Sequence, residues 1–454
     1  MQGVSIGRIH HGWSSLYTRI AWRRPTWPPV GTEYFQATRV PPQLSVSFTP
    51  QVAHGNRRVT GNMATIDEVT VGSYYVDVRV HQVVPTQLGH FDLRDLTPYF
   101  IQDGCQIERD NYASMDHATA RLSFSFTDEQ VLEVFGVPEV PWSSMRLRPS
   151  MRLVSHDGLG ETDWYNLGVF FPETPIRRAD QQPKVYDADC HDIISAIAEP
   201  TGGTIFIPGG ETVQTAIEGL FNLRSPGGDL QLLANVPRAF PRQIVGTVPS
   251  DRQWVIDENT TWLLVIDQLL EMVGWRPPWV DSDGNLTSDR WVDPRLLPID
   301  ITLNDLPSAS VITLGTSNKL DTFGVPNHWV FIRNDFDPEV SGAPSLEDGI
   351  VVRNNLDAGP SSQQARQRIV SSVQRVDVAD QTSLELYADR VVLQDTIPSA
   401  NLCLDIAPRP LPWHRGIASV TIRELGIVED IFLISSWTLP LDGADAKLVM
   451  DGIQ

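Results

Sequence analysis

The C-terminal part of the chain changes from a helical to a strand pattern of apolar residues. Over 380–392, apolar side chains recur at every third or fourth position, which is the spacing of one helix face. The period becomes two over 402–406 and again over 417–422, and a longer, mostly apolar run follows at 427–439. With a last apolar segment at 447–450, the pattern predicts one helix followed by a four-stranded antiparallel meander.

A second region of alternating residues lies in the first half of the chain. The strictest alternation covers 118–126, and together with 105–110 it predicts a hairpin whose turn lies near 113–116. Two further segments, 145–153 and 164–171, predict another strand pair. We therefore expect an antiparallel β-domain here.

The middle of the chain has a different pattern. Apolar residues at helical spacing predict amphipathic helices over 213–221 and 262–273, the second capped by Asn259 or Thr260 and stopped by Gly274. Further on, 281–285 has the composition of a hairpin turn. This region is expected to be α/β.

These patterns together predict an α+β fold that is mainly β, with two barrel-like antiparallel β-domains separated by an α/β insert. We assign 1–60 to an extended N-terminal arm, 61–190 to the first β-domain and 191–306 to the insert. The second β-domain is assigned to 307–454, and 336–364, rich in Asp, Gly, Pro and Ser, is expected to be a long exposed loop within it.

Composition narrows the possible partners. The 454 residues are 41% hydrophobic and 20% charged, as in an ordinary globular protein. A net charge of −21 disfavours nucleic acid and anionic membranes as ligands, although it suits the wall of a DNA channel; the alternative is that it only keeps the protein soluble. No apolar run is long enough to span a bilayer, and the N-terminus has no apolar secretory core.

The chain has three cysteines, Cys105, Cys190 and Cys403, and no CxxC pair. This pattern predicts neither a zinc site nor a disulfide framework, and it suits a protein folded in a reducing cytoplasm.

One cluster of potential metal ligands stands out. Asp187, Asp189, His191 and Asp192 surround Cys190, and carboxylate and imidazole groups could bind a divalent ion. The run also leads into a predicted helix, where acidic residues of the first turn stabilise the helix dipole without a metal. We favour the capping interpretation.

Three other groups have a simpler structural explanation. Residues 281–285 resemble the start of a calcium loop, but their glycine comes at position four instead of six, which favours a plain turn. His156 and Asp157, with Glu161 and Asp163, could supply a general acid and base, but a polar loop predicts no apolar pocket to shift their pKa values. The adjacent pair His10-His11 would point apart in a helix or a strand.

No catalytic motif with a known mechanism occurs. GxSxG, Walker A, GxGxxG and HExxH are absent, and the glycine turns at 201–204 and 208–210 lack a phosphate-binding lysine. We therefore expect no enzyme activity, no cofactor, and no catalytic, cofactor-binding or metal-ligating residue. Two alternatives stay open. One is a cell-wall glycan hydrolase using carboxylates of 156–163 or 335–348, and the other is a carbohydrate-binding adhesin, suggested by 13 Trp residues.

Two stretches, taken in order, resemble a known family. The first is the hairpin from Gly104, followed by Met145-Arg146-Leu147-Arg148-Pro149, Asn166-Leu167-Gly168-Val169-Phe170 and the run Tyr186 to Asp192. The second begins at Thr382-Ser383-Leu384-Glu385-Leu386-Tyr387-Ala388 and continues through the closing strands, with Trp275 to Leu286 between the two. Over residues 90–454 the chain resembles the baseplate hub or minor tail proteins of long-tailed, siphovirus-type phages of actinobacteria.

The resemblance implies a structural role. It implies a homotrimer whose two β-domains per subunit form a pseudo-sixfold ring that continues the tail tube at the tip of the virion, as a DNA conduit and attachment platform. The implied partners are the distal tail protein, the tape measure protein and other minor tail or fibre proteins, with viral DNA as transient cargo. It implies assembly in the host cytoplasm, no direct membrane insertion and no catalytic residues.

Overall fold

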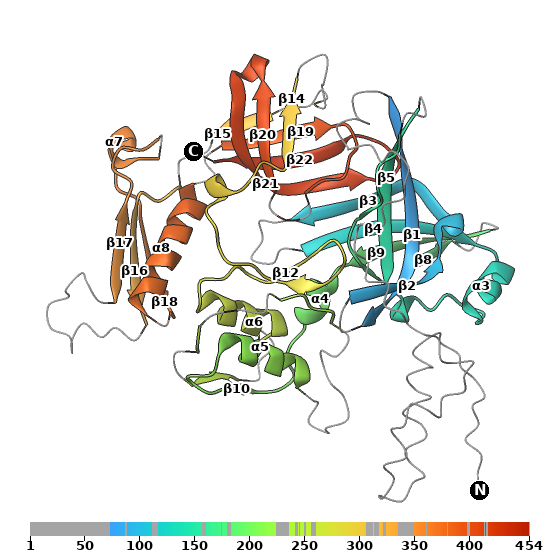
Figure 1. Cartoon of the computed structure of the whole chain (residues 1–454), viewed down its shortest axis with the longest axis horizontal. Helices are drawn as coiled ribbons and strands as arrows, with labels where there is room; N and C mark the ends of the chain where they lie inside the picture. The colour runs from blue at the N-terminus through green and yellow to red at the C-terminus, as the bar shows by residue number, and fades with distance from the viewer. Residues whose placement is uncertain are drawn as a thin grey trace, which may run out of the picture.

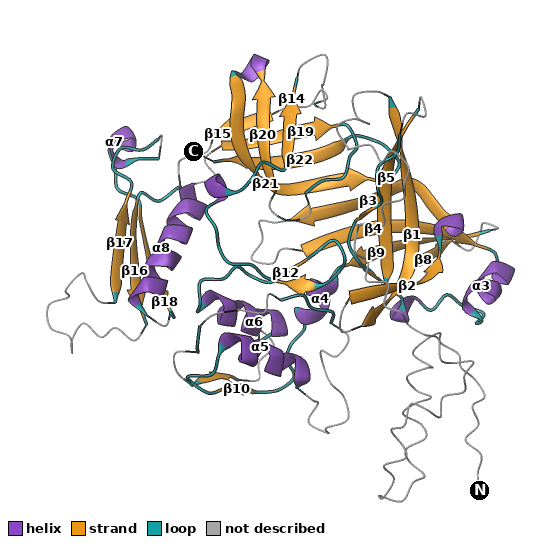
Figure 2. Cartoon of the chain, viewed as in Figure 1, coloured by secondary structure: helices purple, strands orange, loops and turns teal. Residues whose placement is uncertain are grey.

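The computed structural model describes most of the chain after the predicted arm. It describes residues 73–453 except 87–88, 111–116, 157–159, 174, 179–182, 224–235, 241–243, 245, 249–250, 256–259, 306–311, 313–316, 321–323, 335–348, 360, 379, 397–399, 413 and 415. The arm at 1–60, the pair His10-His11 and the turn near 113–116 lie outside the described residues. The fold is α+β and mainly β, as predicted (Figures 1 and 2).

The first β-unit is built from two sheets packed face to face. One sheet has the order β2-β1-β5-β6 and contains β1 (Tyr74–Thr86), β2 (Gly89–Asp95), β5 (Leu147–Ser155) and β6 (Tyr165–Asn166). The other contains β3 (Phe100–Asp110), β4 (His117–Phe126), β7 (Phe171–Pro172), β8 (Ile176–Arg178) and β9 (Lys184–His191). The predicted pairing of 105–110 with 118–126 is confirmed as β3–β4, and that of 145–153 with 164–171 as β5–β6. The sequence pattern did not predict helix α3 (Asp128–Phe135), which begins at a capping box formed by Thr127 and Gln130.

The C-terminal strands continue the second sheet of the first β-unit. β21 (Ile427–Pro440) pairs antiparallel with β20 (Ile417–Ile422) along its first half and with β3 along its last residues, where Leu439 lies opposite Ile107. β22 (Ala446–Gly452) pairs with the other edge of β21. One sheet of 11 strands therefore runs through both β-units. The buried apolar residues of both units also form one cluster.

The four C-terminal strands are antiparallel, as predicted, but they do not form a meander. β19 (Ala400–Ile406) pairs with β22, and β20 lies on the far side of β21, so the order β20-β21-β22-β19 is that of a Greek key. β14 (Ile301–Asn304) pairs in parallel with β20, and β15 (Ser317–Leu320) pairs with β19. β14 and β15 thus extend this strand order at its two ends.

The insert has its own core. Its elements are α4 (Ile193–Ile197), β10 (Ile205–Ile207), α5 (Val213–Asn222), β11 (Arg252–Trp254), α6 (Trp262–Glu271), β12 (Trp279–Val280) and β13 (Leu286–Thr287). Both predicted helices are present, with Thr212 and Thr261 as their N-caps, so the second cap is one residue beyond the predicted pair. A separate cluster of buried apolar residues joins these elements.

The structure contains a third unit, in which two features differ from the sequence prediction. It consists of β16 (His328–Arg333), β17 (Ile350–Asn354), α7 (Gln363–Arg366), β18 (Ser371–Val376) and α8 (Gln381–Thr396). Helix α8 packs on the sheet β17-β16-β18, and not on the strands that follow it, because Leu384, Ala388 and Val391 share a buried cluster with Trp329 and Phe331. The predicted loop at 336–364 is wrong where the chain forms β17 and α7; its part at 336–348 lies outside the described residues.

A buried arginine joins this third unit to the insert. Arg390 of α8 is 8% exposed; its Nη2 donates to Glu271 Oε1 of α6 at 3.0 Å and its Nη1 to the Trp275 carbonyl at 3.2 Å. A buried guanidinium is costly unless it is paired, so these bonds hold α8 against α6. None of the described helices is long and apolar enough to cross a membrane.

The shared sheet predicts that the two β-units unfold together. Ile107 and Leu439 face each other across β3 and β21 and are both 0% exposed. Replacing either by Ala should lower the unfolding free energy by about 2–5 kcal/mol while retaining a single transition, measured by denaturant titration with probes in both units. Leu132→Ala, at a position that is 58% exposed, is the control and should change the unfolding free energy by about 0.5 kcal/mol or less. Two separate transitions, one for each β-unit, would contradict this prediction.

Candidate functional site

The shared sheet has a polar side that faces away from the core. Figure 1 shows β9, β4, β3, β21 and β22 in succession across the molecule. Apolar residues of these strands, such as Leu122, Ile107 and Leu448, point into the core. Because side chains alternate along a strand, the residues between them form a continuous opposite face across both β-units.

This face is polar and carries more carboxylates than cations. On β9, β4 and β3 it presents Asp187, Asp189, His191, Thr119, Arg121, Ser123, Gln106, Glu108 and Asp110. On β21, β22 and β19 it presents Ser436, Thr438, Lys447, Val449, Cys403 and Asp405. These positions include five carboxylates but only two lysine or arginine residues, Arg121 and Lys447. Such a face remains hydrated and repels polyanions.

The acidic cluster at 187–192 is divided between this face and a helix cap. Asp192 is 2% exposed, and its carboxylate accepts hydrogen bonds from the backbone N–H of Ile194 at 2.9 Å and of Ala118 at 2.6 Å. The capping interpretation is therefore confirmed for Asp192. Burial raises the pKa of Asp192 to about 6, and the two backbone hydrogen bonds oppose that rise.

The other members of the cluster have separate partners. Asp187 accepts a hydrogen bond from the Ser123 hydroxyl at 2.8 Å, and His191 Nε2 lies 2.9 Å from Glu173. Among the described residues, no group of three or more His, Cys, Asp or Glu side chains is arranged to hold a metal ion.

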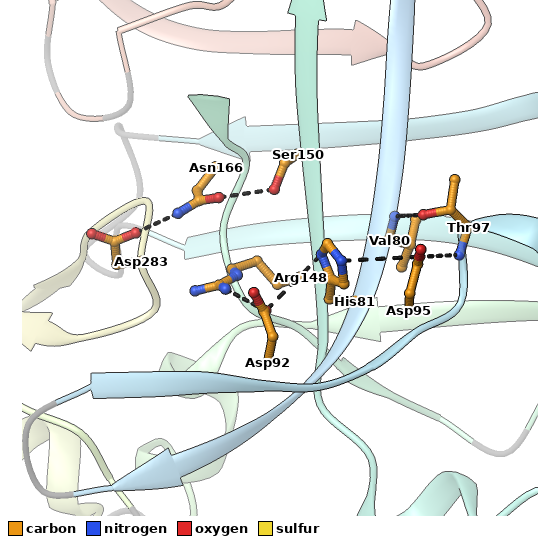
Figure 3. A network of polar contacts seen from close by, with 9 residues as sticks. All are labelled: Val80, His81, Asp92, Asp95, Thr97, Arg148, Ser150, Asn166 and Asp283. Carbon is orange, nitrogen blue, oxygen red and sulfur yellow. Dashed lines mark hydrogen bonds and ion pairs between the residues drawn. The ribbon is translucent and has the colours of Figure 1, made fainter. Parts of the chain in front are cut away.

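The turn at 281–285 connects β12 and β13, as predicted, and has a second role. Within the turn, Asp281 Oδ1 accepts hydrogen bonds from the backbone N–H groups of Asp283 and Asn285 at 3.0 and 2.8 Å. Outside it, Asn166 Nδ2 donates to Asp283 Oδ1 at 2.6 Å, which Figure 3 shows together with the Ser150–Asn166 bond. The turn therefore docks the insert onto the first β-unit.

Gly284 and His90 fit this docked turn closely. Gly284 has φ +80°, a conformation that favours glycine, and a Cβ at this position would lie only 2.5 Å from the Cβ of Val169. Both the backbone conformation and the lack of space for a side chain therefore require glycine. His90 Nδ1 lies 3.0 Å from the Asp283 carbonyl, and Arg146 Nη1 lies 3.1 Å from its Nε2. Because arginine can only donate, Nε2 accepts and Nδ1–H donates, and the ring is neutral. Burial, reinforced by the Arg146 guanidinium, lowers the pKa of His90 to about 3.

A network of charged side chains covers the outer face of β1, β2 and β5. Arg148 binds Asp92, and His81 lies 4.0 Å from Asp92 and 3.9 Å from Asp95. Figure 3 shows these contacts together. Thr97 Oγ1 accepts a hydrogen bond from the Val80 N–H at 3.0 Å, and this anchors the end of β2. Burial lowers the pKa of His81.

The polar loop at 156–163, where we expected no acid–base site, contributes to the same face. Glu161 accepts a hydrogen bond from Arg152 at 2.6 Å, and Arg152 also pairs with Asp77 at 2.7 Å. Residues 157–159, with Asp157, and residues 335–348 lie outside the described residues. In the described part of 156–163, Glu161 is therefore an ion-paired carboxylate.

The residues that sequence reasoning missed are those that join the units. His90, Arg146, Asn166 and Arg390 each make contacts between segments that are far apart in sequence. Of the residues at these joints, only Gly284 could be recognised from local sequence, because an Asp-Gly pair is typical of a turn.

Acidification should weaken the docked turn. Folded His90, with its pKa lowered to about 3, binds no proton between pH 7 and 5, whereas in the unfolded chain it does so below about 6.5. His90 should therefore reduce stability by about 1–2 kcal/mol as pH falls from 7 to 5. In the His90→Asn variant, denaturant titrations should show a smaller loss of unfolding free energy between pH 7 and 5. Both proteins are compared with their own stability at pH 8, where His90 is neutral in the folded and the unfolded chain. Equal pH profiles would count against this role of His90.

Comparison with known proteins identifies the fold. No protein-family model matches the sequence, and no curated protein matches it. The tail protein from Neisseria meningitidis MC58 has a TM-score of 0.52 and 13% identity, over 84% of this chain and 96% of that chain. The 43 kDa tail protein of prophage MuSo2 from Shewanella oneidensis has a TM-score of 0.50 and 10% identity, over 84% of this chain and 98% of that chain. The protein thus shares the fold of two tail proteins, one of them from a prophage.

Proposed function

We propose that the protein is a structural baseplate hub at the tip of a siphovirus-type phage tail. Three copies form a pseudo-sixfold ring that continues the tail tube and lets DNA pass during ejection. The observation that carries this proposal is the single sheet that joins two β-units edge to edge through β3 and β21. Two such units in each of three copies give six wall segments.

The polar face of that sheet suits the inner wall of the ring. A channel for DNA requires a surface to which phosphate groups do not bind, because each Lys or Arg contact adds affinity by releasing counterions. On this face, Glu108, Asp187 and Asp189 repel phosphate, and the neighbouring Thr119 and Ser123 side chains are small and uncharged. The opposite face is core and cannot line a channel.

The assembly partners follow from this position. We propose that the ring is a homotrimer that contacts the distal tail protein on one side, receives the end of the tape measure protein, and supports other minor tail or fibre proteins. The fold shared with two tail proteins over most of their length supports a location in the virion tail. Assembly would occur in the host cytoplasm.

The proposal assigns no chemistry to the chain. The described carboxylates of greatest interest from sequence are engaged in structure: Asp192 caps α4, Glu161 pairs with Arg152, and Asp281 organises its turn. These contacts favour a structural role over that of a glycan hydrolase.

The proposed trimeric ring has a defined mass that can be measured. Size-exclusion chromatography with light scattering should give about three times the 50.6 kDa of one chain, and electron microscopy should show a ring with six similar lobes. A protein that stays monomeric at tens of micromolar would contradict the proposal.

The acidic wall predicts how DNA binding responds to charge. Wild-type protein should not bind duplex DNA at physiological salt, whereas Glu108→Lys with Asp189→Lys should bind it with an affinity that falls steeply as salt is raised. The matched control reverses two exposed carboxylates of α3, Glu129→Lys and Glu133→Lys, on a helix outside the sheet. Equal DNA binding by the two charge-reversed proteins would argue against the sheet as the channel wall.

A further inference from the structure

One face of the sheet in the third unit is apolar and uncovered by described elements. Apart from the strand pairs of the sheet itself, α8 is the one described helix or strand in repeated contact with β16 and β17. In Figure 1, α8 lies between the three strands and the rest of the molecule, so their other face points away from it. Val330, Ile332, Ile350 and Val352 do not belong to the cluster that includes α8. They lie on the opposite side from Trp329 and Phe331 because side chains alternate along a strand.

The residues of this face form rows across the three strands. Val352, Val330 and Val373 make one row, and Val373 is 64% exposed. The next row consists of Ile350, Ile332 and Arg375. Val330, Ile332, Ile350 and Val352 are half-buried, and a contiguous apolar sheet surface that no described helix or strand covers is typical of a docking site.

Charge restricts the occupant of this face. Arg375 is exposed and makes no hydrogen bond or ion pair with another described residue, and the rows contain no acidic residue. Residues 1–72 carry seven Arg and three acidic residues, so this segment has the wrong sign to dock beside Arg375. The fitting occupant is a protrusion that combines apolar and acidic side chains.

The hairpin between β20 and β21 is such a protrusion. Its tip exposes Leu425 by 44% and Val428 by 64%, and Glu424, Glu429 and Asp430 beside them are also exposed. A bulge shifts the strand register here, and Glu429 has φ +55°. A positive φ in a non-glycine residue is strained, and a bulge changes the direction in which side chains point. The strained backbone therefore sets the orientation of the side chains at this tip.

The tip and the open sheet face cannot meet within one chain. Figure 1 shows the β20–β21 hairpin at the top of the molecule and the sheet β17-β16-β18 at its left edge, facing outward. We propose that the tip at 423–430 of one copy docks on the open sheet face of the next copy, with Val428 against Val373 and the tip carboxylates beside Arg375. The two surfaces differ, so the contact is head-to-tail and closes into a ring when the rotation permits. This inference rests on the proposed ring and names the surfaces that hold it together.

Two exposed substitutions test the pairing in the full-length chain. Val373→Asp and Val428→Asp should each weaken trimer formation by on the order of tenfold or more in sedimentation experiments, because each places a carboxylate in the apolar contact. Leu132→Asp, at a similarly exposed position on α3, should leave the trimer unchanged. Thermal unfolding, measured at a concentration at which all variants are monomeric, should be unchanged because all three positions are exposed, and it separates loss of contact from loss of fold.

A mixture of the two variants tests the head-to-tail geometry. The Val373→Asp chain keeps an intact tip and the Val428→Asp chain keeps an intact sheet face. Mixing them should therefore give 1:1 dimers that cannot close. Charge reversal is the second test: Arg375→Glu should weaken the trimer about tenfold, and adding Glu424→Arg and Asp430→Arg in the same chain should restore it.

The outcomes distinguish this inference from the proposed function. A wild-type trimer that neither valine substitution weakens would overturn the pairing and leave the ring proposal intact. Weakening by Val373→Asp but not by Val428→Asp would mean that a different segment covers the sheet, and would also overturn it. Wild-type protein that is monomeric throughout would overturn both proposals.

Discussion

Five residues of β21 pair with five residues of β3, and the arrangement of both β-units depends on this short ladder. Without it, each unit would expose a strand edge with unpaired N–H and C=O groups, which is a site of aggregation. With it, Ile107 and Leu439 become fully buried neighbours, and the two cores merge. The ladder also aligns the polar faces of the strands on both sides, so that a continuous surface forms.

The two smaller units are attached to this body by polar contacts. The insert is docked through the turn at 281–285, and the third unit is held to the insert by Arg390. Buried polar groups are stabilising only when each has its partner, so these joints specify one geometry and tolerate little change. At His90 the same requirement fixes the tautomer, because the Asp283 carbonyl needs a donor while Arg146 needs an acceptor.

Several described members of the acidic clusters have structural partners. With 56 Asp and Glu residues, carboxylates fall close together in sequence by chance, and the structure uses them for capping, turn formation and ion pairing. The informative property was which side of a strand a carboxylate occupies. That property follows from local alternation, but its consequence appears only when neighbouring strands are known.

Sequence by itself determined the mainly β class, the positions of α5 and α6, and most strand segments, because periodicity and capping are local properties of the chain. It could not determine that α8 packs on β16 and β17, since its apolar stripe fits any apolar surface. It also mistook part of 336–364 for a loop, because β17 is a short strand within a polar segment. The pairing of β3 with β21 and the polar joints at His90 and Arg390 were decided by tertiary structure. They depend on register and on partners from distant segments, which no local pattern encodes.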